Sequence, residues 1–214
     1  MDNQFERSIA LIGENNFKKV QTKTVAIFGL GGVGGTAFIA LLRSGFSHFV
    51  LIDFDKVSIS NLNRQILYNL DSVDKSKIEE AKRYALSVNK DVEIQSLNLK
   101  INSDNIHELD KYKIDFIVDA IDDIKGKIAI SKFATCNNIP LVVSLGMANR
   151  LSSENVFVTK LNKTTGDPLA RKLRYEFKNN GQKRKAISIH SFDNLCPTIK
   201  CFLVSDWNVF CGFF

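Results

Sequence analysis

The sequence has little proline, few cysteines and no long hydrophobic run, and each of these scarcities excludes a class of protein. Only 3 of its 214 residues are proline and 12 are glycine, which excludes collagen-like and low-complexity chains. No stretch of 18 or more apolar residues occurs, and the start of the chain lacks a basic segment followed by an apolar one. We therefore expect a cytoplasmic protein without a membrane span.

The four cysteines do not form a metal-binding pattern. None belongs to a Cys-x-x-Cys pair, and none has a histidine at zinc-finger spacing. The sequence thus predicts free thiols in a reducing compartment and no structural metal. The cysteines are Cys136, Cys196, Cys201 and Cys211.

The residues that are abundant indicate a folded domain with an uneven charge. Apolar residues make up 44% of the chain and charged residues 24%, enough for a buried core and a solvated surface. The net charge is +6, and residues 151 to 214 hold ten Lys and Arg against five Asp and Glu. This excess favours a surface for a polyanion, although a merely solvated basic face is the commoner cause.

Hydrophobic patterning predicts an α/β fold with a doubly wound, mainly parallel sheet. Short apolar runs typical of strands buried on both faces alternate with segments of helical spacing, and strand–helix–strand units of this kind are right-handed. Strands are predicted at 24–28, 48–53, 93–99, 116–121, 140–144 and 156–159. One helix is predicted to begin within the glycine run 29–35 and to end at Gly45. Others are predicted over 78–88, 124–136 and 169–177, the last with Asp167 as its N-cap.

A glycine-rich turn marks the first strand–helix junction as a nucleotide-binding site. Gly29, Gly31 and Gly34 form G-x-G-x-x-G, and Asp53 ends the next strand 19 residues after Gly34. Glycines let backbone N–H groups approach phosphate oxygens, and an aspartate in that position can accept the ribose hydroxyls. This pattern by itself does not distinguish NAD from ATP.

The following segments favour a triphosphate. Arg64 and Lys77 come after the ribose aspartate, and a dinucleotide has no terminal phosphates for them to neutralise. Asp122 follows the next strand, where its carboxylate could hold Mg²⁺ on those phosphates.

Residues 1 to 146 resemble the ubiquitin-activating-enzyme-like adenylyltransferases, the superfamily of ThiF, MoeB and HesA. The resemblance implies that Asp53 binds the ribose, that Asn61, Arg64 and Lys77 bind phosphates, and that Asp122 binds Mg²⁺. Arg7 would reach the γ-phosphate of a neighbouring subunit, which implies a homodimer. The motif residues are Arg7, Gly29, Gly31, Gly32, Gly34, Asp53, Asp55, Asn61, Asn63, Arg64, Gln65, Lys77, Asp119, Asp122 and Asp123.

The second half is similar to the tRNA threonylcarbamoyladenosine dehydratases within that superfamily. Two segments, 146–151 and 163–174, carry this likeness. It implies an enzyme that uses ATP to adenylate the threonyl carboxylate of the modified tRNA, after which the modification's own carbamoyl group closes a ring. Arg64, Lys77 and Asp122 would be the catalytic residues, and a sulfur-transfer protein is a further partner that the resemblance leaves open.

The basic residues of the second half fit a tRNA substrate. Residues 171 to 185 hold seven Lys and Arg and one Glu, and such residues position RNA through its phosphates. We divide the chain into a Rossmann-like ATP-binding domain, 1–160, and a short basic C-terminal extension, 161–214. The predicted tRNA contacts are Lys163, Arg171, Arg174, Lys183, Arg184 and Lys185.

Two alternatives stay open at this point. One is an adenylyltransferase that activates the C-terminus of a ubiquitin-like or sulfur-carrier protein. Such adenylyltransferases often carry Cys-x-x-Cys zinc ligands, and this sequence has none. The other is a truncated, catalytically impaired copy. His190 stands where the family has Glu and Ala148 where it has Gly, and the segment from Asp193 onward does not match the family's closing segment.

Overall fold

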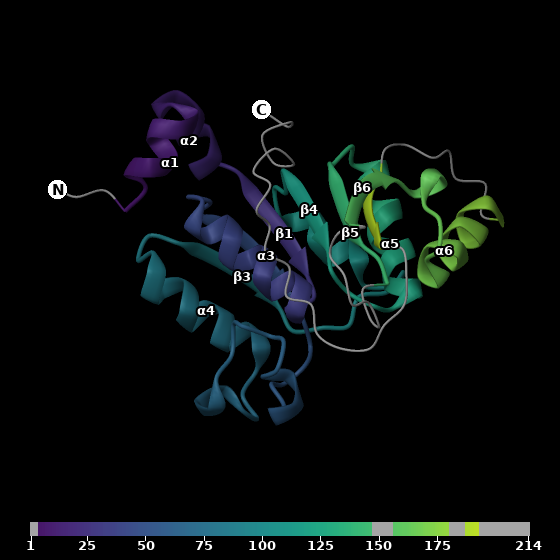
Figure 1. Cartoon of the computed structure of the whole chain (residues 1–214), viewed down its shortest axis with the longest axis horizontal. Coiled ribbons are helices and arrows are strands. Elements are labelled where there is room, and N and C mark those ends of the chain that lie inside the picture. The colour runs from purple at the N-terminus through teal and green to yellow at the C-terminus, as the bar shows by residue number, and fades with distance from the viewer. Residues whose placement is uncertain (1–3, 147–155, 180–186, 193–214) are drawn as a thin grey trace.

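The computed structural model describes residues 4–146, 156–179 and 187–192, which form one sheet with helices on both faces (Figure 1). The helices are α1 (Glu6–Ile12), α2 (Glu14–Gln21), α3 (Gly32–Arg43), α4 (Lys77–Val88), α5 (Ile124–Cys136) and α6 (Pro168–Asn179). The strands are β1 (Thr24–Phe28), β2 (His48–Ile52), β3 (Glu93–Leu97), β4 (Phe116–Asp119), β5 (Leu141–Ser144), β6 (Val156–Lys160) and β7 (Ile187–Phe192).

The sheet is parallel except at one edge. Its strand order is β3-β2-β1-β4-β5-β7-β6, and only β6 runs antiparallel, against β7. The direction of strand addition reverses between β1 and β4, and ligands of doubly wound sheets bind outside the carboxyl ends at such a reversal. The prediction of a mainly parallel α/β fold is confirmed. Because β1 and β4 are parallel neighbours, the loops that follow them lie side by side at the carboxyl edge of the sheet.

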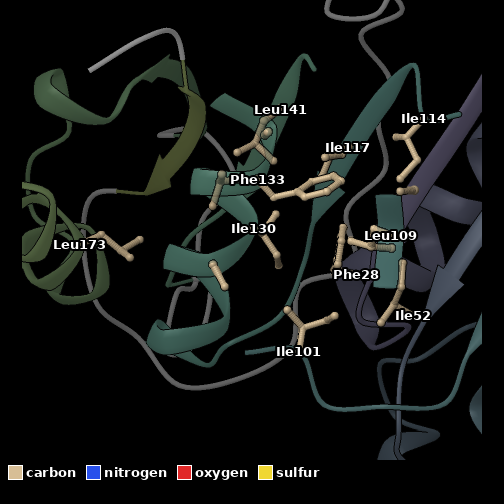
Figure 2. Packing of buried hydrophobic residues seen from close by; sticks show 14 of the residues in the cluster. Phe28, Ile52, Ile101, Leu109, Ile114, Ile117, Ile130, Phe133, Leu141 and Leu173 are labelled. Carbon is tan, nitrogen blue, oxygen red and sulfur yellow. The ribbon is translucent and has the colours of Figure 1, made fainter. Parts of the chain in front are cut away.

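Alternate residues of the central strands enter two separate cores. Val25 and Ile27 of β1 pack with α3 and α4, whereas Ala26 and Phe28 pack on the opposite face with α5 and α6. Figure 2 shows Phe28 and Ile117 on the sheet side of this second core. Ile130 and Phe133 of α5 lie on its helix side. Burial of both faces explains why these strands read as continuous apolar runs in the sequence.

Several element boundaries differ from the predicted ones in the same direction. Strands β2, β3 and β4 end one or two residues earlier than the apolar pattern suggests, at Ile52, Leu97 and Asp119. At each of these points the chain leaves the ladder for a loop at the carboxyl edge, and after β3 and β4 the apolar residues Leu99 and Ile121 of these loops are still partly buried. Hydrophobic patterning reports burial rather than ladder pairing, so it overestimates strand length.

The part of the chain after residue 160 is joined to the first part by packing and pairing. Helix α6 packs on α5, and β7, which the sequence did not predict, pairs with β5 on one side and β6 on the other. The backbone of His190 lies in β7, opposite Ser144 and Val158. The division of the chain at residue 160 stays a proposal.

Two expectations about single features can be compared with the described residues. Cys136 is the last residue of α5, inside the predicted helix, and it is a free cysteine with an exposed side chain. Within the described ranges, none of the helices has the length and apolar character needed to cross a bilayer. The other three cysteines lie outside the described residues.

Candidate functional site

The loop between β1 and α3 has a shape that only glycine permits at two positions. Gly29 has φ +83°, and a Cβ on it would lie 3.0 Å from the carbonyl oxygen of Ala120 in the β4 loop. A Cβ on Gly34, in the first turn of α3, would overlap the carbonyl oxygen of Gly29. The close packing brings the amino end of α3, with N–H groups that have no partner within the helix, to the carboxyl edge of the sheet.

Asp53 holds this glycine loop from the end of β2. Its Oδ2 accepts the backbone N–H of Leu30 at 2.6 Å, and its Oδ1 accepts that of Asp55 at 2.8 Å. The Tyr68 hydroxyl donates to the carbonyl oxygen of Leu30 at 2.8 Å, and burial together with the charge of Asp53 raises the pKa of Tyr68. Both backbone groups of Leu30 are therefore fixed, while each Asp53 oxygen keeps a lone pair for a ribose hydroxyl.

The segment that contains Asn61, Asn63, Arg64 and Gln65 lies against the same loop. The Arg64 carbonyl oxygen is 3.4 Å from the position of a Cβ on Gly32, so the arginine backbone is next to the start of α3. One guanidinium nitrogen of Arg64 donates to Asn63 Oδ1 at 3.0 Å and is held within its own turn. The Asn61 amide oxygen accepts the backbone N–H of Ser58 at 3.1 Å, so this oxygen stabilises the turn.

Gln65 is buried beside the glycine loop with an unused acceptor. Its Nε2 lies 3.8 Å from the position of a Cβ on Gly31, and its Oε1 has no hydrogen-bond partner among the described residues. A buried amide oxygen without a partner is costly, and a ligand hydroxyl or amine would satisfy it. Gln65 thus lies against the glycine loop, and its role in ligand binding stays a prediction.

Lys77 forms an ion pair with Asp55. The two side chains form an ion pair of 2.8 Å between Lys77 Nζ and Asp55 Oδ2, and Lys77 is only 6% exposed at the start of α4. Asp55 is about half exposed, so the carboxylate rather than the ammonium faces solvent. The sequence placed both residues in the site without predicting that they would be paired.

Asp122 lies in the β4–α5 loop with its carboxylate exposed. The carboxylate that is buried at the end of β4, and therefore needs a partner, is that of Asp119, the last residue of the strand. In the described ranges, no group of three or more His, Cys, Asp or Glu residues could hold a metal ion. Mg²⁺ bound to nucleotides uses one or two carboxylates with phosphate oxygens and water, so a single exposed Asp122 fits it.

Asp119 is paired with a lysine that the sequence analysis missed. Lys127 of α5 and Asp119 are both 0% exposed, and Lys127 Nζ lies 2.8 Å from Asp119 Oδ1. The same ammonium donates to the carbonyl oxygen of Ser144 at 2.8 Å and so joins the carboxyl ends of β4 and β5. The signal was available: Lys127 is three residues before Ile130, on the buried face of an apolar helix.

Arg7 does not belong to the site of its own chain. It is exposed on α1, and α1 and α2 come directly before β1 at the amino edge of the sheet. Figure 1 shows these two helices at the opposite end of β1 from the start of α3. If Arg7 contacts a phosphate, as the resemblance implies, it must do so in another copy of the chain.

The predicted tRNA contacts divide into three groups. Lys163 and Arg171 are exposed. Arg174 instead donates to the carbonyl oxygen of Thr164 at 2.9 Å and also to its hydroxyl, an intramolecular contact that orients α6. Lys183, Arg184 and Lys185 lie outside the described residues, as does Ala148.

A family model describing the ThiF family matches residues 5–201, nearly the whole of this arrangement. The chain belongs to the ThiF family. This membership confirms the superfamily expected from the motif residues. The matched range includes the glycine loop, the loops after β2 and β4, and α6.

Relatives within the family include tRNA-modifying enzymes. The chain is 33% identical over 184 residues to a tRNA threonylcarbamoyladenosine dehydratase of Bacillus subtilis, covering 86% of this chain and 72% of that protein. It is 32% identical over 177 residues to the Escherichia coli dehydratase, covering 83% of this chain and 66% of that protein. A crystal structure of the E. coli tRNA N6-threonylcarbamoyladenosine dehydratase in complex with ATP superimposes on 91% of this chain and 82% of its own, with a TM-score of 0.86 and 29% identity.

Proposed function

We propose that this ThiF-family protein is an ATP-dependent tRNA threonylcarbamoyladenosine dehydratase. The observation that supports the proposal is that the glycine loop contacts Asp53, the Arg64 turn and the end of β4 at Ala120. Lys77 lies near this loop through its ion pair with Asp55, and Asp122 follows Ala120 by two residues. The dehydratases among its relatives, one of them seen with ATP, support the same activity.

In the proposed reaction, the threonyl carboxylate of the substrate attacks the α-phosphorus of ATP and displaces pyrophosphate. The carbamoyl group of the same modification then attacks the acyl carbon, expels AMP as the leaving group and loses an N–H proton, which closes the ring. Both steps place the nucleophile beside its electrophile, so proximity supplies much of the acceleration and no enzyme cysteine is required.

The residues of this chain have distinct tasks in that reaction. The N–H groups at the start of α3 and the Arg64 guanidinium stabilise charge on the phosphates, where it increases as pyrophosphate leaves. Lys77 would exchange part of its contact with Asp55 for a phosphate oxygen. Asp53, held by the Leu30 N–H, fixes the ribose so that the α-phosphorus meets the carboxylate. Bound Mg²⁺, with Asp122 as its protein ligand, would neutralise the phosphates.

A homodimer is part of the proposal. Three apolar side chains that flank the Arg64 turn, Ile59, Ile66 and Leu70, are each more than half exposed. Association through this surface would bury them and could bring Arg7 of one copy toward the phosphates of the other. A cytoplasmic location, where tRNA is found, and a sulfur-transfer partner complete the proposal.

Pyrophosphate exchange tests the activity. The protein is incubated with Mg-ATP and labelled pyrophosphate, first with tRNA carrying threonylcarbamoyladenosine and then with ubiquitin-like carrier proteins. Label should enter ATP only with the tRNA. Exchange with a carrier protein alone would indicate the adenylyltransferase alternative, and none with either would indicate an impaired copy.

Arg64→Ala tests the phosphate site. It should weaken ATP binding far more than AMP binding, because the β- and γ-phosphates lose their bidentate partner. Arg43→Ala is the matched control, since Arg43 is exposed at the last residue of α3, about 16 Å along the helix from Gly32. Equal loss of ATP and AMP affinity in Arg64→Ala by calorimetry would refute the phosphate role.

A further inference from the structure

Helix α6 has one apolar face that is buried and an opposite face that exposes basic residues and a tyrosine. Ala170, Leu173 and Phe177 are buried and belong to the core that α5 shares. Figure 2 shows Leu173 on α6 with its side chain directed toward α5. The helix is therefore held in place by apolar packing, and its opposite face is free of any structural task in the core.

The opposite face presents an aromatic ring between cations. Arg171, Lys172, Tyr175 and Lys178 are all exposed, and Tyr175 is 65% exposed. Residues three and four apart are neighbours on a helix, so Tyr175 adjoins Arg171 and Lys172 on one side and Lys178 on the other. At roughly 100° per residue, Tyr175 points almost opposite to the buried side chains. We call these four residues the outer face of α6.

We infer that the outer face of α6 is an RNA-binding surface on which Tyr175 stacks against an unpaired base while the three cations contact flanking phosphates. The inference rests on the proposed function for the identity of the RNA, a tRNA with a single-stranded loop. The inference adds base stacking by Tyr175 to the phosphate contacts of the proposed function, and those contacts alone would not require a tyrosine.

Charge and chemistry favour RNA over other occupants. The outer face carries three positive charges, and the one acidic residue of α6, Glu176, is only partly exposed, so the face attracts a polyanion. Phosphate contacts need only cations, so an exposed tyrosine adds little to them. In a duplex the bases are stacked on one another, so the tyrosine has no free base to contact. A base in a single-stranded loop exposes its π-face, and an aromatic ring between cations is the arrangement that binds it.

The position of α6 relative to the site is fixed by its N-cap. Asp167 accepts the backbone N–H of Ala170 at 3.0 Å and that of Gly146, just past β5, also at 3.0 Å. The helix therefore starts at the carboxyl edge of the sheet. Tyr175 is eight residues further, about 12 Å along the helix axis. A base stacked on Tyr175 would thus be a neighbour of the modified nucleotide in the same loop rather than that nucleotide itself.

The experiment measures binding of tRNA by filter titration over a series of salt concentrations, using the full chain. Tyr175→Ala should weaken tRNA binding about tenfold with an unchanged salt dependence, because stacking releases no counterions. Tyr175→Phe, which keeps the ring, should bind like the wild type. Replacing Arg171, Lys172 and Lys178 together with Ala should make log affinity fall less steeply with log salt, with a slope less negative by up to about 2 to 3.

Two controls separate stacking from general effects. A duplex RNA of similar length should bind Tyr175→Ala and wild type equally, since it offers no unpaired base. Lys90→Ala removes an exposed cation before β3, at the amino edge of the sheet, and should change neither affinity nor slope.

Three results would overturn the inference. Equal loss of affinity in Tyr175→Phe and Tyr175→Ala would exclude stacking. Equal loss for duplex and tRNA would exclude an unpaired base. A change in sedimentation of Tyr175→Ala with tRNA binding intact would identify the outer face as a protein interface. Pyrophosphate exchange on wild type is measured in parallel, so absence of exchange with normal tRNA binding would refute the proposed activity and leave the binding surface standing.

Discussion

Replacement of Lys127 by Met should destabilise the protein strongly, and in a manner that depends on pH. Lys127 and Asp119 are fully buried, and the ammonium serves both Asp119 Oδ1 and the carbonyl oxygen of Ser144. Asp119 Oδ2 already lacks a partner among the described residues. Methionine fills a similar volume but leaves a buried carboxylate unpaired, and loss of one partner from such a pair costs about 3 to 5 kcal/mol of unfolding free energy.

The sign of the pH dependence follows from the carboxylate. Burial raises the pKa of Asp119, and the Lys127 ammonium and the N–H of Ile121 only partly offset this. Without Lys127 the folded form should protonate Asp119, whereas the unfolded chain, with a pKa of about 3.9, is ionised above pH 5. The folded variant then binds one proton more than the unfolded chain. Its stability should fall by about 1.4 kcal/mol per pH unit as pH rises from about 4 toward the folded pKa.

Urea unfolding at pH 5 and pH 7 measures this effect as the difference between variant and wild type. The deficit of Lys127→Met should be larger at pH 7. In the double variant Asp119→Asn/Lys127→Met no charge is left buried, so much of the stability should return and the extra pH dependence should vanish. A deficit below about 1 kcal/mol, a deficit that does not change with pH, or a double variant no more stable than the single one would refute the reasoning.

Three further substitutions have clear expected outcomes. Gly34→Ala should abolish ATP binding in calorimetry and lower the melting temperature, because the new methyl group overlaps the carbonyl oxygen of Gly29. Asp167→Ala should cost about 1 kcal/mol or more in urea unfolding, since α6 loses its N-cap and the N–H of Gly146 loses its acceptor; unchanged stability would show that the cap is dispensable. Gly45→Ala should also destabilise, because φ is +107° there and an aromatic ring occupies the space for a Cβ; an unchanged unfolding midpoint would contradict this.

Features that depend on neighbouring residues in the chain could be predicted from the sequence. The bounds of the helix over 124–136 are those observed for α5. The Asp167 N-cap is where the sequence placed it. The glycine loop was predictable because the sterics that require Gly29 arise at a strand–helix junction that local patterning identifies. Parallel strand ends meet at one edge, so the contact of the glycine loop with both Asp53 and the end of β4 at Ala120 was predictable as well.

Features that depend on partners far apart in the chain were not predictable in this way. Arg174 counted as one of many basic residues, yet its guanidinium is directed to Thr164 by the packing of α6. The insertion of β7 between β5 and β6 joins segments with 26 and 42 residues between them, and no local pattern specifies which edge a late strand takes.

The sequence by itself thus determined the α/β layering, the glycine loop and the order of polar residues along the strand ends, because apolar period and glycine sterics act within a few residues. Only the tertiary structure decided that Asp119 rather than Asp122 is the buried carboxylate, that Lys127 pairs with it, and that Arg7 lies at the opposite edge of the sheet. Burial is set by what packs over a residue, and the partner of a buried charge is set by which elements meet, so both are properties of the assembled fold.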